Sequence, residues 1–238
     1  MKFSIVVPCY NEADTIEATI RSLVALETDS LQIEVVVVDD CSTDGSASVV
    51  ERLMPSFPGF KLIRHPVNRG KGAALRTGFE AATGDAVGIQ DADGEYDPKD
   101  YLKMLSAIEG GRAEVVYGSR YAFRDERRVL RFWHSLMNGF LTGMSNVFSD
   151  MSLTDMETCY KLFSRDVIAE IAPRLREERF GFEPEVTAYV ARGMREHGWR
   201  IVEFPISYRP RTFLEGKKIG WKDGFRALWC IVKYNLFV

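Results

Sequence analysis

The sequence has no excess of positive charge. Its 31 lysines and arginines are outnumbered by 34 aspartates and glutamates, giving a net charge of −3. A nucleic-acid-binding surface is usually basic, so this balance argues against a nucleic-acid partner. The chain of 238 residues also contains no internal repeat, no low-complexity tract and no linker-like stretch. We therefore expect one α/β domain over residues 1–238.

Cysteines are few, and no segment is both long and fully apolar. The four cysteines form no C-x-x-C pair and are too sparse for a disulfide-stabilised domain. The N-terminal residues predict a strand and lack the features of a targeting signal. The segment 132–149 contains no Asp, Glu, Lys or Arg, but His134, two asparagines and several serines make it too polar for a membrane span. These features predict a cytoplasmic protein with reduced thiols.

Short β-branched runs alternate with helical patterns in the first half. Strands are predicted at 3–7, 33–38, 61–63, 86–89 and 114–117. Helix starts are predicted at Asn11, at Ser42 or Thr43, and at Asp97. The second half is less regular, with predicted helices at 129–148, at 183–194 and from about 220, and predicted strands at 158–163 and 201–208. The alternation predicts a mostly parallel sheet with helices on both faces.

Polar residues follow three of the predicted strands, at 8–12, 39–42 and 91–95. In open α/β sheets, ligands bind beyond the carboxyl ends of the strands, so these clusters are expected to converge on one cleft. The third cluster, Asp91-Ala92-Asp93-Gly94-Glu95, has three carboxylates, and oxygen ligands suit Mg²⁺ or Mn²⁺. An acidic pair in a solvated turn is the alternative. The position of the motif directly after a buried strand favours a metal site formed by Asp91, Asp93 and Glu95.

Six segments spread over most of the chain form a specific combination: 6–12 (VVPCYNE), 38–45 (VDDCSTDG), 68–72 (NRGKG), 91–93 (DAD), 118–120 (GSR) and 155–161 (DMETCYK). Together they resemble the inverting family 2 glycosyltransferases of the GT-A (Rossmann-like) fold, particularly the branch of dolichol-phosphate mannosyltransferases and polyprenyl-phosphate glycosyltransferases. This resemblance implies metal-dependent transfer of a sugar from a nucleotide diphosphate sugar to a dolichyl or undecaprenyl phosphate. It also implies a division into a nucleotide-sugar-binding half, 1–120, and an acceptor-binding and membrane-interface half, 121–238.

The resemblance implies roles for particular residues. Asp93 is expected to be catalytic, and the nucleotide sugar is expected to be surrounded by Pro8, Tyr10, Glu12, Asp39, Asp40, Asp91, Ala92 and Asp93. Glu95 occupies a position where close relatives often have Gln. The segment 68–72 lacks the pattern of a Walker motif and predicts a tight turn before a helix, with Lys71 near the donor. The base and the sugar stay open among GDP-mannose, UDP-glucose and UDP-N-acetylglucosamine.

The acceptor is expected in the second half. A phosphate acceptor is already anionic and needs orientation by cations more than a strong base. Arg120, Arg131, Lys161 and Lys217 are the predicted phosphate ligands, and Arg120 is also a catalytic candidate. A hydroxyl acceptor on a polysaccharide, lipid or protein would instead need a general base. Asp155 is the first candidate for that role, although it can equally orient Lys161 or cap a turn.

Two amphipathic patterns predict contact with the inner face of a membrane. In the first, Phe132, Leu136, Phe140, Met144 and Phe148 recur every four residues, and Trp133, Met137 and Leu141 widen the stripe. In the C-terminal helix, the stripe is Trp221, Phe225, Leu228, Val232 and Leu236. Core packing is the alternative for both.

A basic segment at 211–220 is expected to close over the donor. A non-catalytic nucleotide-sugar-binding subunit remains an alternative function for the whole chain.

Overall fold

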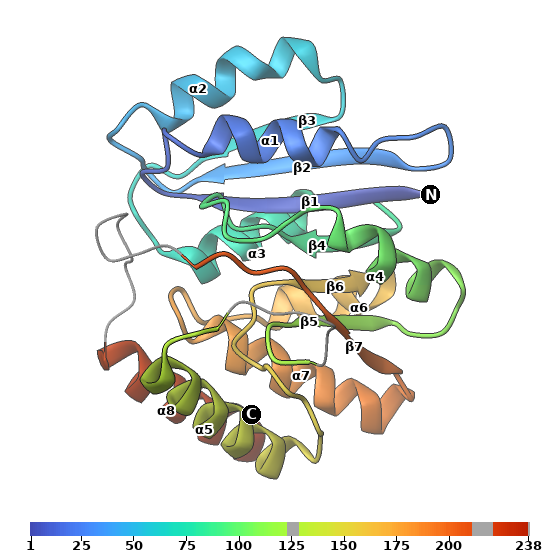
Figure 1. Cartoon of the computed structure of the whole chain (residues 1–238), viewed down its shortest axis with the longest axis vertical. Helices are drawn as coiled ribbons and strands as arrows, with labels where there is room; N and C mark the ends of the chain where they lie inside the picture. Colours follow the sequence, from blue (N-terminus) through green and yellow to red (C-terminus); the bar gives the residue numbers. More distant parts are fainter. Residues whose placement is uncertain (123–128, 211–220, 238) are drawn as a thin grey trace.

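Seven strands form one mixed sheet in the order β3-β2-β1-β4-β6-β5-β7 (Figure 1). The computed structural model describes residues 1–122, 129–210 and 221–237, with the backbone alone at 221–223. The strands are β1 (Lys2–Cys9), β2 (Gln32–Asp39), β3 (Phe60–Arg64), β4 (Ala86–Ile89), β5 (Val115–Ser119), β6 (Lys161–Ser164) and β7 (Ile201–Pro205). Neighbouring strands are parallel except where β6 pairs antiparallel with β4 and β5. The predicted mostly parallel sheet is confirmed.

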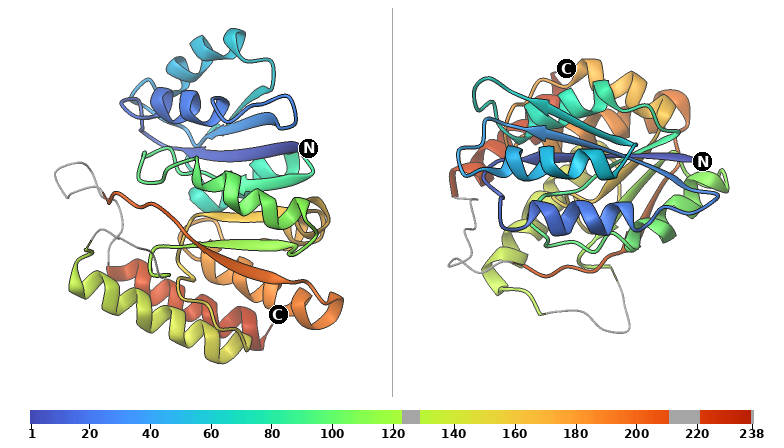
Figure 2. Two further views of the ribbon diagram at one scale, coloured as in Figure 1. Left: turned by 45° about the vertical axis from the view of Figure 1, so that its right-hand side comes forward. Right: turned by 90° about the horizontal axis from the view of Figure 1, so that it is seen from above.

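Helices cover both faces of this sheet (Figures 1 and 2). They are α1 (Ile16–Val24), α2 (Ser46–Leu53), α3 (Lys71–Ala81), α4 (Asp100–Glu109), α5 (Phe132–Ser149), α6 (Arg165–Ile171), α7 (Phe182–His197) and α8 (Trp221–Leu236). Single-turn 3₁₀ helices η1 (Met54–Ser56) and η2 (Ala172–Arg174) follow α2 and α6. Because strand side chains alternate, Phe3, Ile5 and Val7 enter the core beneath α1, α2 and α4, whereas Val6 enters the core beneath α3, α6 and α7.

Helix starts after β1 and β2 lie three to five residues later than the sequence pattern predicts. The prediction treated Asn11 and Ser42 or Thr43 as capping residues, but α1 begins at Ile16 and α2 at Ser46. The polar side chains join the two loops instead: Asn11 Oδ1 accepts a hydrogen bond from the Thr43 amide at 2.8 Å, and Asp44 accepts one from the Ala13 amide at 2.9 Å. α4 likewise begins at Asp100, not at Asp97, and the short helix α6 has no counterpart in the predicted elements.

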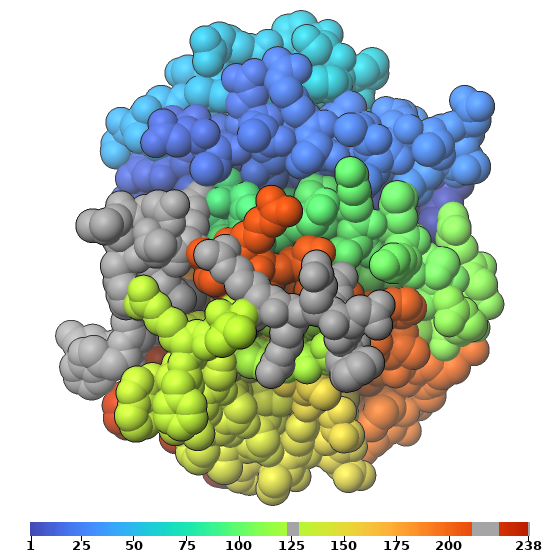
Figure 3. All heavy atoms as spheres, viewed as in Figure 1, coloured from blue at the N-terminus to red at the C-terminus, as the bar shows by residue number. Residues whose placement is uncertain are grey.

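The helices α5 and α8 lie side by side and both pack on α7, so much of their outer surface faces away from the sheet (Figures 1 and 2). We call the exposed apolar side chains of this surface the outer apolar face: Phe132, Trp133, Leu136, Met137, Phe140, Phe225, Trp229 and Leu236, each 49–74% exposed. Figure 3 shows α5, in yellow-green, at the lower left of the molecular surface.

The predicted stripe on α5 is divided between surface and core. Its N-terminal half is exposed, but Leu141 is buried, and Met144 and Phe148 pack against the core beneath α7. Leu228 of α8 packs against the same core, and the side chain of Trp221 lies outside the described atoms. Among the described residues, no helix is both long and apolar enough to cross a bilayer.

Candidate functional site

A pocket of about 490 Å³ opens at the carboxyl ends of β1, β2 and β4. Most of the predicted donor and metal residues line it: Pro8, Tyr10, Glu12, Asp40, Lys71, Asp91, Ala92, Asp93 and Glu95, together with Arg120. The convergence of three strand-end loops on one cavity follows from the parallel arrangement of these strands. Asp39, Arg131, Asp155 and Lys161 do not line this pocket, and Lys217 lies outside the described residues.

The loops after β1 and β2 hold each other in place. The Asn11 amide donates to Ser42 Oγ at 3.0 Å, and the Glu12 amide donates to Ser46 Oγ at 2.9 Å. Asn11 and Cys41 both have positive φ angles, of 54° and 64°, which side chains other than glycine rarely adopt. Unfavourable backbone conformations persist where the surrounding structure fixes them, and such positions concentrate near binding sites.

Asp40 organises the start of α3. Its carboxylate accepts hydrogen bonds from the amides of Arg69 at 2.9 Å and Gly70 at 2.6 Å, and it contacts His65 Nδ1 at 2.7 Å. Gly70 has a φ of 96°, and a Cβ atom there would lie 2.4 Å from the Glu178 carbonyl oxygen. The predicted tight turn is therefore present, and it places Lys71 at the first position of α3.

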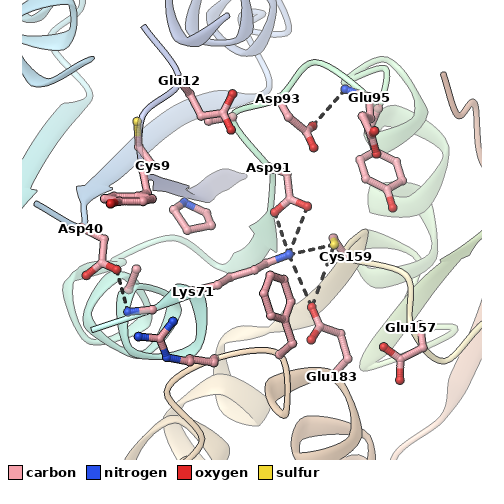
Figure 4. A pocket seen from close by; sticks show the side chains of 18 of the residues that line it. Cys9, Glu12, Asp40, Lys71, Asp91, Asp93, Glu95, Glu157, Cys159 and Glu183 are labelled. Carbon is pink, nitrogen blue, oxygen red and sulfur yellow. Dashed lines mark hydrogen bonds and ion pairs between the residues drawn. The ribbon is translucent and has the colours of Figure 1, made fainter. Parts of the chain in front are cut away.

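Lys71 connects both halves of the sequence at the pocket (Figure 4). Its ammonium lies 2.8 Å from Asp91 Oδ1, 3.4 Å from Glu183 Oε1 and 2.8 Å from Cys159 Sγ. Burial by itself lowers the pKa of Lys71, but the negative charges around it, Asp91 foremost, outweigh burial and hold that pKa well above its usual value. Lys71 is therefore a permanent cation inside the pocket.

The segment 91–95 supplies an all-oxygen donor set of the kind that suits Mg²⁺ or Mn²⁺. Asp93 Oδ1 accepts a hydrogen bond from the Glu95 amide at 3.0 Å, while Asp91 pairs with Lys71. Within the described residues, no three acidic, histidine or cysteine side chains are close enough together to form a metal site. The residue types fit a divalent cation, but their side chains are not gathered around one point here, so joint coordination by Asp91, Asp93 and Glu95 remains a prediction.

Two of three stacked tyrosines form hydrogen bonds with the main chain on either side of this segment. The rings of Tyr101 and Tyr160 stack at 4.2 Å, and those of Tyr96 and Tyr160 at 5.0 Å. The Tyr160 hydroxyl donates to the carbonyl of Asp97 at 3.1 Å, and the Tyr101 hydroxyl donates to the carbonyl of Ile89. These bonds fix the chain on both sides of the 91–95 turn.

Asp155 is fully buried and does not line the pocket, which places it away from a general-base position. Its Oδ2 accepts from Arg120 Nε at 2.7 Å and from the Arg120 amide at 3.0 Å, and its Oδ1 accepts from Arg120 Nη2 at 2.7 Å and from Asn138 Nδ2 at 3.1 Å. A carboxylate that accepts this many hydrogen bonds holds its partner in one orientation. Asp155 thus orients Arg120, not Lys161 as the sequence suggested.

Lys161 is also fully buried, and its ammonium donates to the main-chain carbonyls of Met156, at 3.0 Å, and Thr158. It lies 5.0 Å from the centre of the Tyr117 ring. The predicted contact with an acceptor phosphate is wrong for this arrangement, because the lysine supports the chain behind the pocket. Arg131 is exposed immediately before α5, outside the pocket lining.

Several pocket residues have no counterpart among the predicted site residues: Tyr96, His134, Glu157, Cys159, Arg179, Phe180, Glu183 and Tyr208. Glu157 and Cys159 lie within the 155–161 motif, so the motif located them without indicating which members face the pocket. Glu183 and Arg179 reach the pocket through the packing of α7, and no local pattern marks them.

The sequence of this chain matches a known protein family. The profile described as "Glycosyl transferase family 2" matches residues 4–172. The chain belongs to glycosyl transferase family 2. The predicted glycosyltransferase activity is thereby confirmed at the level of the family.

Two curated relatives and one solved structure illustrate the similarity. Glycosyltransferase AglD of Haloferax volcanii is 26% identical over 89% of this chain and 34% of its own length. Dolichyl-phosphate beta-glucosyltransferase of Saccharomyces cerevisiae is 30% identical over 86% of this chain and 66% of its own length. The chain therefore spans about one third of the length of AglD and about two thirds of the length of the Saccharomyces cerevisiae protein.

The solved structure is glucosyl-3-phosphoglycerate synthase from Mycobacterium tuberculosis, in complex with Mn²⁺, UDP and phosphoglyceric acid. It superposes with a TM-score of 0.68 at 17% identity, covering 100% of this chain and 79% of that one. The superposition supports the expected GT-A fold.

Proposed function

We propose that this family 2 enzyme transfers a sugar, with inversion, from a nucleotide diphosphate sugar to a polyprenyl phosphate. The observation that carries the proposal is a single pocket that combines carboxylates on the 91–95 turn with the cations Lys71 and Arg120. Asp91, Asp93 and Glu95 would hold Mg²⁺ or Mn²⁺, which neutralises charge on a departing diphosphate. The similarity to a protein named dolichyl-phosphate beta-glucosyltransferase supports the lipid phosphate as acceptor.

The first half, 1–120, would bind the donor. Pro8, Tyr10 and Glu12 line the pocket beside Asp40, whose oxygen atoms hold the turn before Lys71. Asp39 is buried, and its Oδ1 has no hydrogen-bond partner in the described part of the chain. An unsatisfied carboxylate oxygen behind the pocket suits an N–H group of a nucleotide base, because burying it without a donor is unfavourable.

The acceptor would bind beside Arg120, at the end of the first half, where residues of the second half, 121–238, hold its side chain. Arg120 lines the pocket with its guanidinium held by Asp155 and Asn138, so its orientation is fixed before a phosphate arrives. Pre-orientation lowers the entropic cost of placing the acceptor oxygen near the anomeric carbon. Lys71, at the start of α3, would add positive charge where the diphosphate leaves.

We infer association with a membrane surface, and the position of α5 supports this inference. His134 of α5 lines the pocket, while its neighbours Phe132 and Trp133 are 68% and 74% exposed. The outer apolar face thus begins at the pocket, where a membrane-embedded lipid could present its phosphate. Exposed apolar surface of this extent is typical of an interface, and burial in the headgroup region would stabilise a peripheral enzyme at the cytoplasmic side.

The proposal is tested by assaying the purified chain with UDP-glucose, GDP-mannose and UDP-N-acetylglucosamine, each with Mg²⁺ or Mn²⁺. A short polyprenyl phosphate serves as acceptor, and the matching polyprenol without phosphate serves as control. We expect one donor to yield a glycosyl phosphate lipid with the phosphate acceptor alone. Transfer to the polyprenol would favour the hydroxyl-acceptor alternative, and donor binding without hydrolysis or transfer would favour the non-catalytic subunit.

A further inference from the structure

Glu157 is a half-buried carboxyl group that has no role in the mechanism proposed above. It lines the pocket, and its Oε1 is shielded from solvent without a hydrogen-bond partner among the described residues. A buried polar atom without a partner is unfavourable, and in a native structure it requires an explanation. In Figure 4, Glu157 lies on the same side of the pocket as Cys159 and Glu183.

The chain on both sides of Glu157 is held firmly. Lys161 donates to the carbonyl oxygens of Met156 and Thr158, the residues immediately before and after it. The Met156 amide donates to Thr142 Oγ1 of α5 at 3.1 Å, and Asp155 is bound to Arg120. The main chain that carries Glu157 at the pocket is therefore fixed on both sides.

The groups around Glu157 disfavour a negative charge on it. Burial and then the Glu183 carboxylate raise its pKa to about 8, and the positive charges of Lys161 and Arg120 only partly offset these effects. The charge of Arg120 is already paired with Asp155. The charged or titratable groups near Glu157 and along its pocket come from α7, β6, the end of β5, its own segment and α5: Glu183, Lys161, Arg120, Asp155 and His134. At neutral pH, Glu157 is thus mostly the neutral acid.

We propose that Glu157 binds the acceptor phosphate as a neutral acid, donating its O–H to one non-bridging phosphate oxygen while another oxygen attacks the anomeric carbon and displaces the nucleoside diphosphate. This proposal rests on the phosphate acceptor of the proposed function and adds a specificity residue to it. A neutral carboxyl can donate a hydrogen bond to an anion, whereas an ionised one repels it. The same residue disfavours a neutral hydroxyl acceptor, because an acid that keeps its proton cannot accept another.

Two variants at this position separate the possible roles. Glutamine keeps a hydrogen-bond donor and cannot ionise, whereas alanine removes the donor. The assay measures kcat/KM for a short polyprenyl phosphate between pH 6 and pH 9, with the donor saturating. We expect wild-type kcat/KM to fall above pH 8, as Glu157 ionises. Glu157→Gln should stay within about three-fold of wild type and lose this alkaline fall, whereas Glu157→Ala should lose about 10- to 100-fold, as expected for a hydrogen bond to a charged group.

Binding measurements distinguish failure of this proposal from failure of the proposed function. Calorimetry with citronellyl phosphate, in the presence of UDP and Mn²⁺, should show binding to wild type and to Glu157→Gln, and at least ten-fold weaker binding to Glu157→Ala. UDP affinity should be equal in all three proteins. If Glu157→Ala binds the phosphate normally, or if Glu157→Gln is as inactive as Glu157→Ala, the donor role is wrong and the polyprenyl phosphate function is unaffected. If wild type binds UDP but not citronellyl phosphate, both proposals fail.

Discussion

Two ion pairs each contribute a cation to the pocket, and they differ in how firmly that cation is held. Lys71 and Asp91 approach to 2.8 Å, and each side chain keeps 16–17% of its exposure. Arg120 and Asp155 approach to 2.7 Å with exposures of 7% and 0%, and they share two parallel hydrogen bonds. Lys71 also contacts Glu183 and Cys159, so it has alternative partners when a ligand arrives. The first pair is suited to rearrangement on donor binding, and the second to fixed orientation of the acceptor.

The largest effect is expected on the donor side, in activity. Asp93→Ala removes a predicted cation ligand on a partly buried turn, so kcat/KM should fall by about 1,000-fold, comparable to the loss of a strong transition-state stabiliser. The melting temperature should change by no more than about 2 °C, as for a substitution outside the core. The matched control is Asp97→Ala, which replaces an exposed acidic residue two positions after this turn. Near-normal turnover by Asp93→Ala would refute the metal role.

The second-largest effect is expected on the acceptor side, and it concerns the free energy of unfolding. Asp155→Ala leaves the Arg120 guanidinium buried without its carboxylate, which costs about 3–5 kcal/mol of unfolding free energy. Asp91→Ala should cost only about 1 kcal/mol, because Lys71 keeps other partners and some solvent contact. Urea unfolding of the two variants checks this contrast. Equal destabilisation would show that the two ion pairs do not differ as described.

The pH dependence of stability tests the state of Glu157, which lies on the acceptor side of the pocket. Its pKa of about 8 is raised above the 4.5 of an ordinary glutamate, chiefly by burial, so the folded state holds the proton more firmly than the unfolded state. Stability therefore decreases as pH rises from about 4.5 to 8, and the loss is complete above pH 8. Glu157→Gln cannot ionise and avoids this loss. Its free energy of unfolding, relative to that of wild type, should therefore increase by about 1–3 kcal/mol as the pH rises from 5 to 9. A constant difference across this range in urea unfolding would contradict the raised pKa.

The smallest effect on the isolated protein is expected at the outer apolar face. Replacing both Phe132 and Trp133 with serine should leave the melting temperature nearly unchanged, because both side chains are exposed. Binding to vesicles of phosphatidylcholine and phosphatidylglycerol should weaken by about ten-fold or more, since substantial apolar area no longer enters the interface. Leu102→Ser on α4, which is 47% exposed, serves as control. Equal vesicle binding by all three proteins would exclude membrane contact through α5.

Much of the fold was predictable from the sequence because local patterns and the global fold agree. The β2 run is buried along nearly its whole length, and Gly70 and Asp40 form the predicted turn before α3. Predictions failed where a polar residue had two possible partners. Asn11 binds the neighbouring loop instead of capping its own helix, and Lys161 supports main-chain carbonyls instead of the pocket.

The candidate site was predictable on the donor side more than on the acceptor side. The donor residues follow directly from strand ends, whose position is set by the parallel sheet. Glu183 and Arg179 instead enter the pocket from α7 and the segment before it, through tertiary packing that leaves no local pattern. The 155–161 motif contains Asp155, Glu157 and Lys161, but only the structure shows that the middle one lines the pocket.

The central claim is that the carboxylates of the 91–95 turn bind a divalent cation together with a nucleotide diphosphate. Isothermal titration of UDP and GDP into the wild-type protein and Asp93→Ala, with and without Mn²⁺, tests it most directly. We predict that Mn²⁺ increases the affinity of wild type for one nucleotide by at least about ten-fold, and that Asp93→Ala loses this increase while keeping its metal-free affinity. Nucleotide affinity that is the same with and without Mn²⁺ in the wild-type protein would contradict the account.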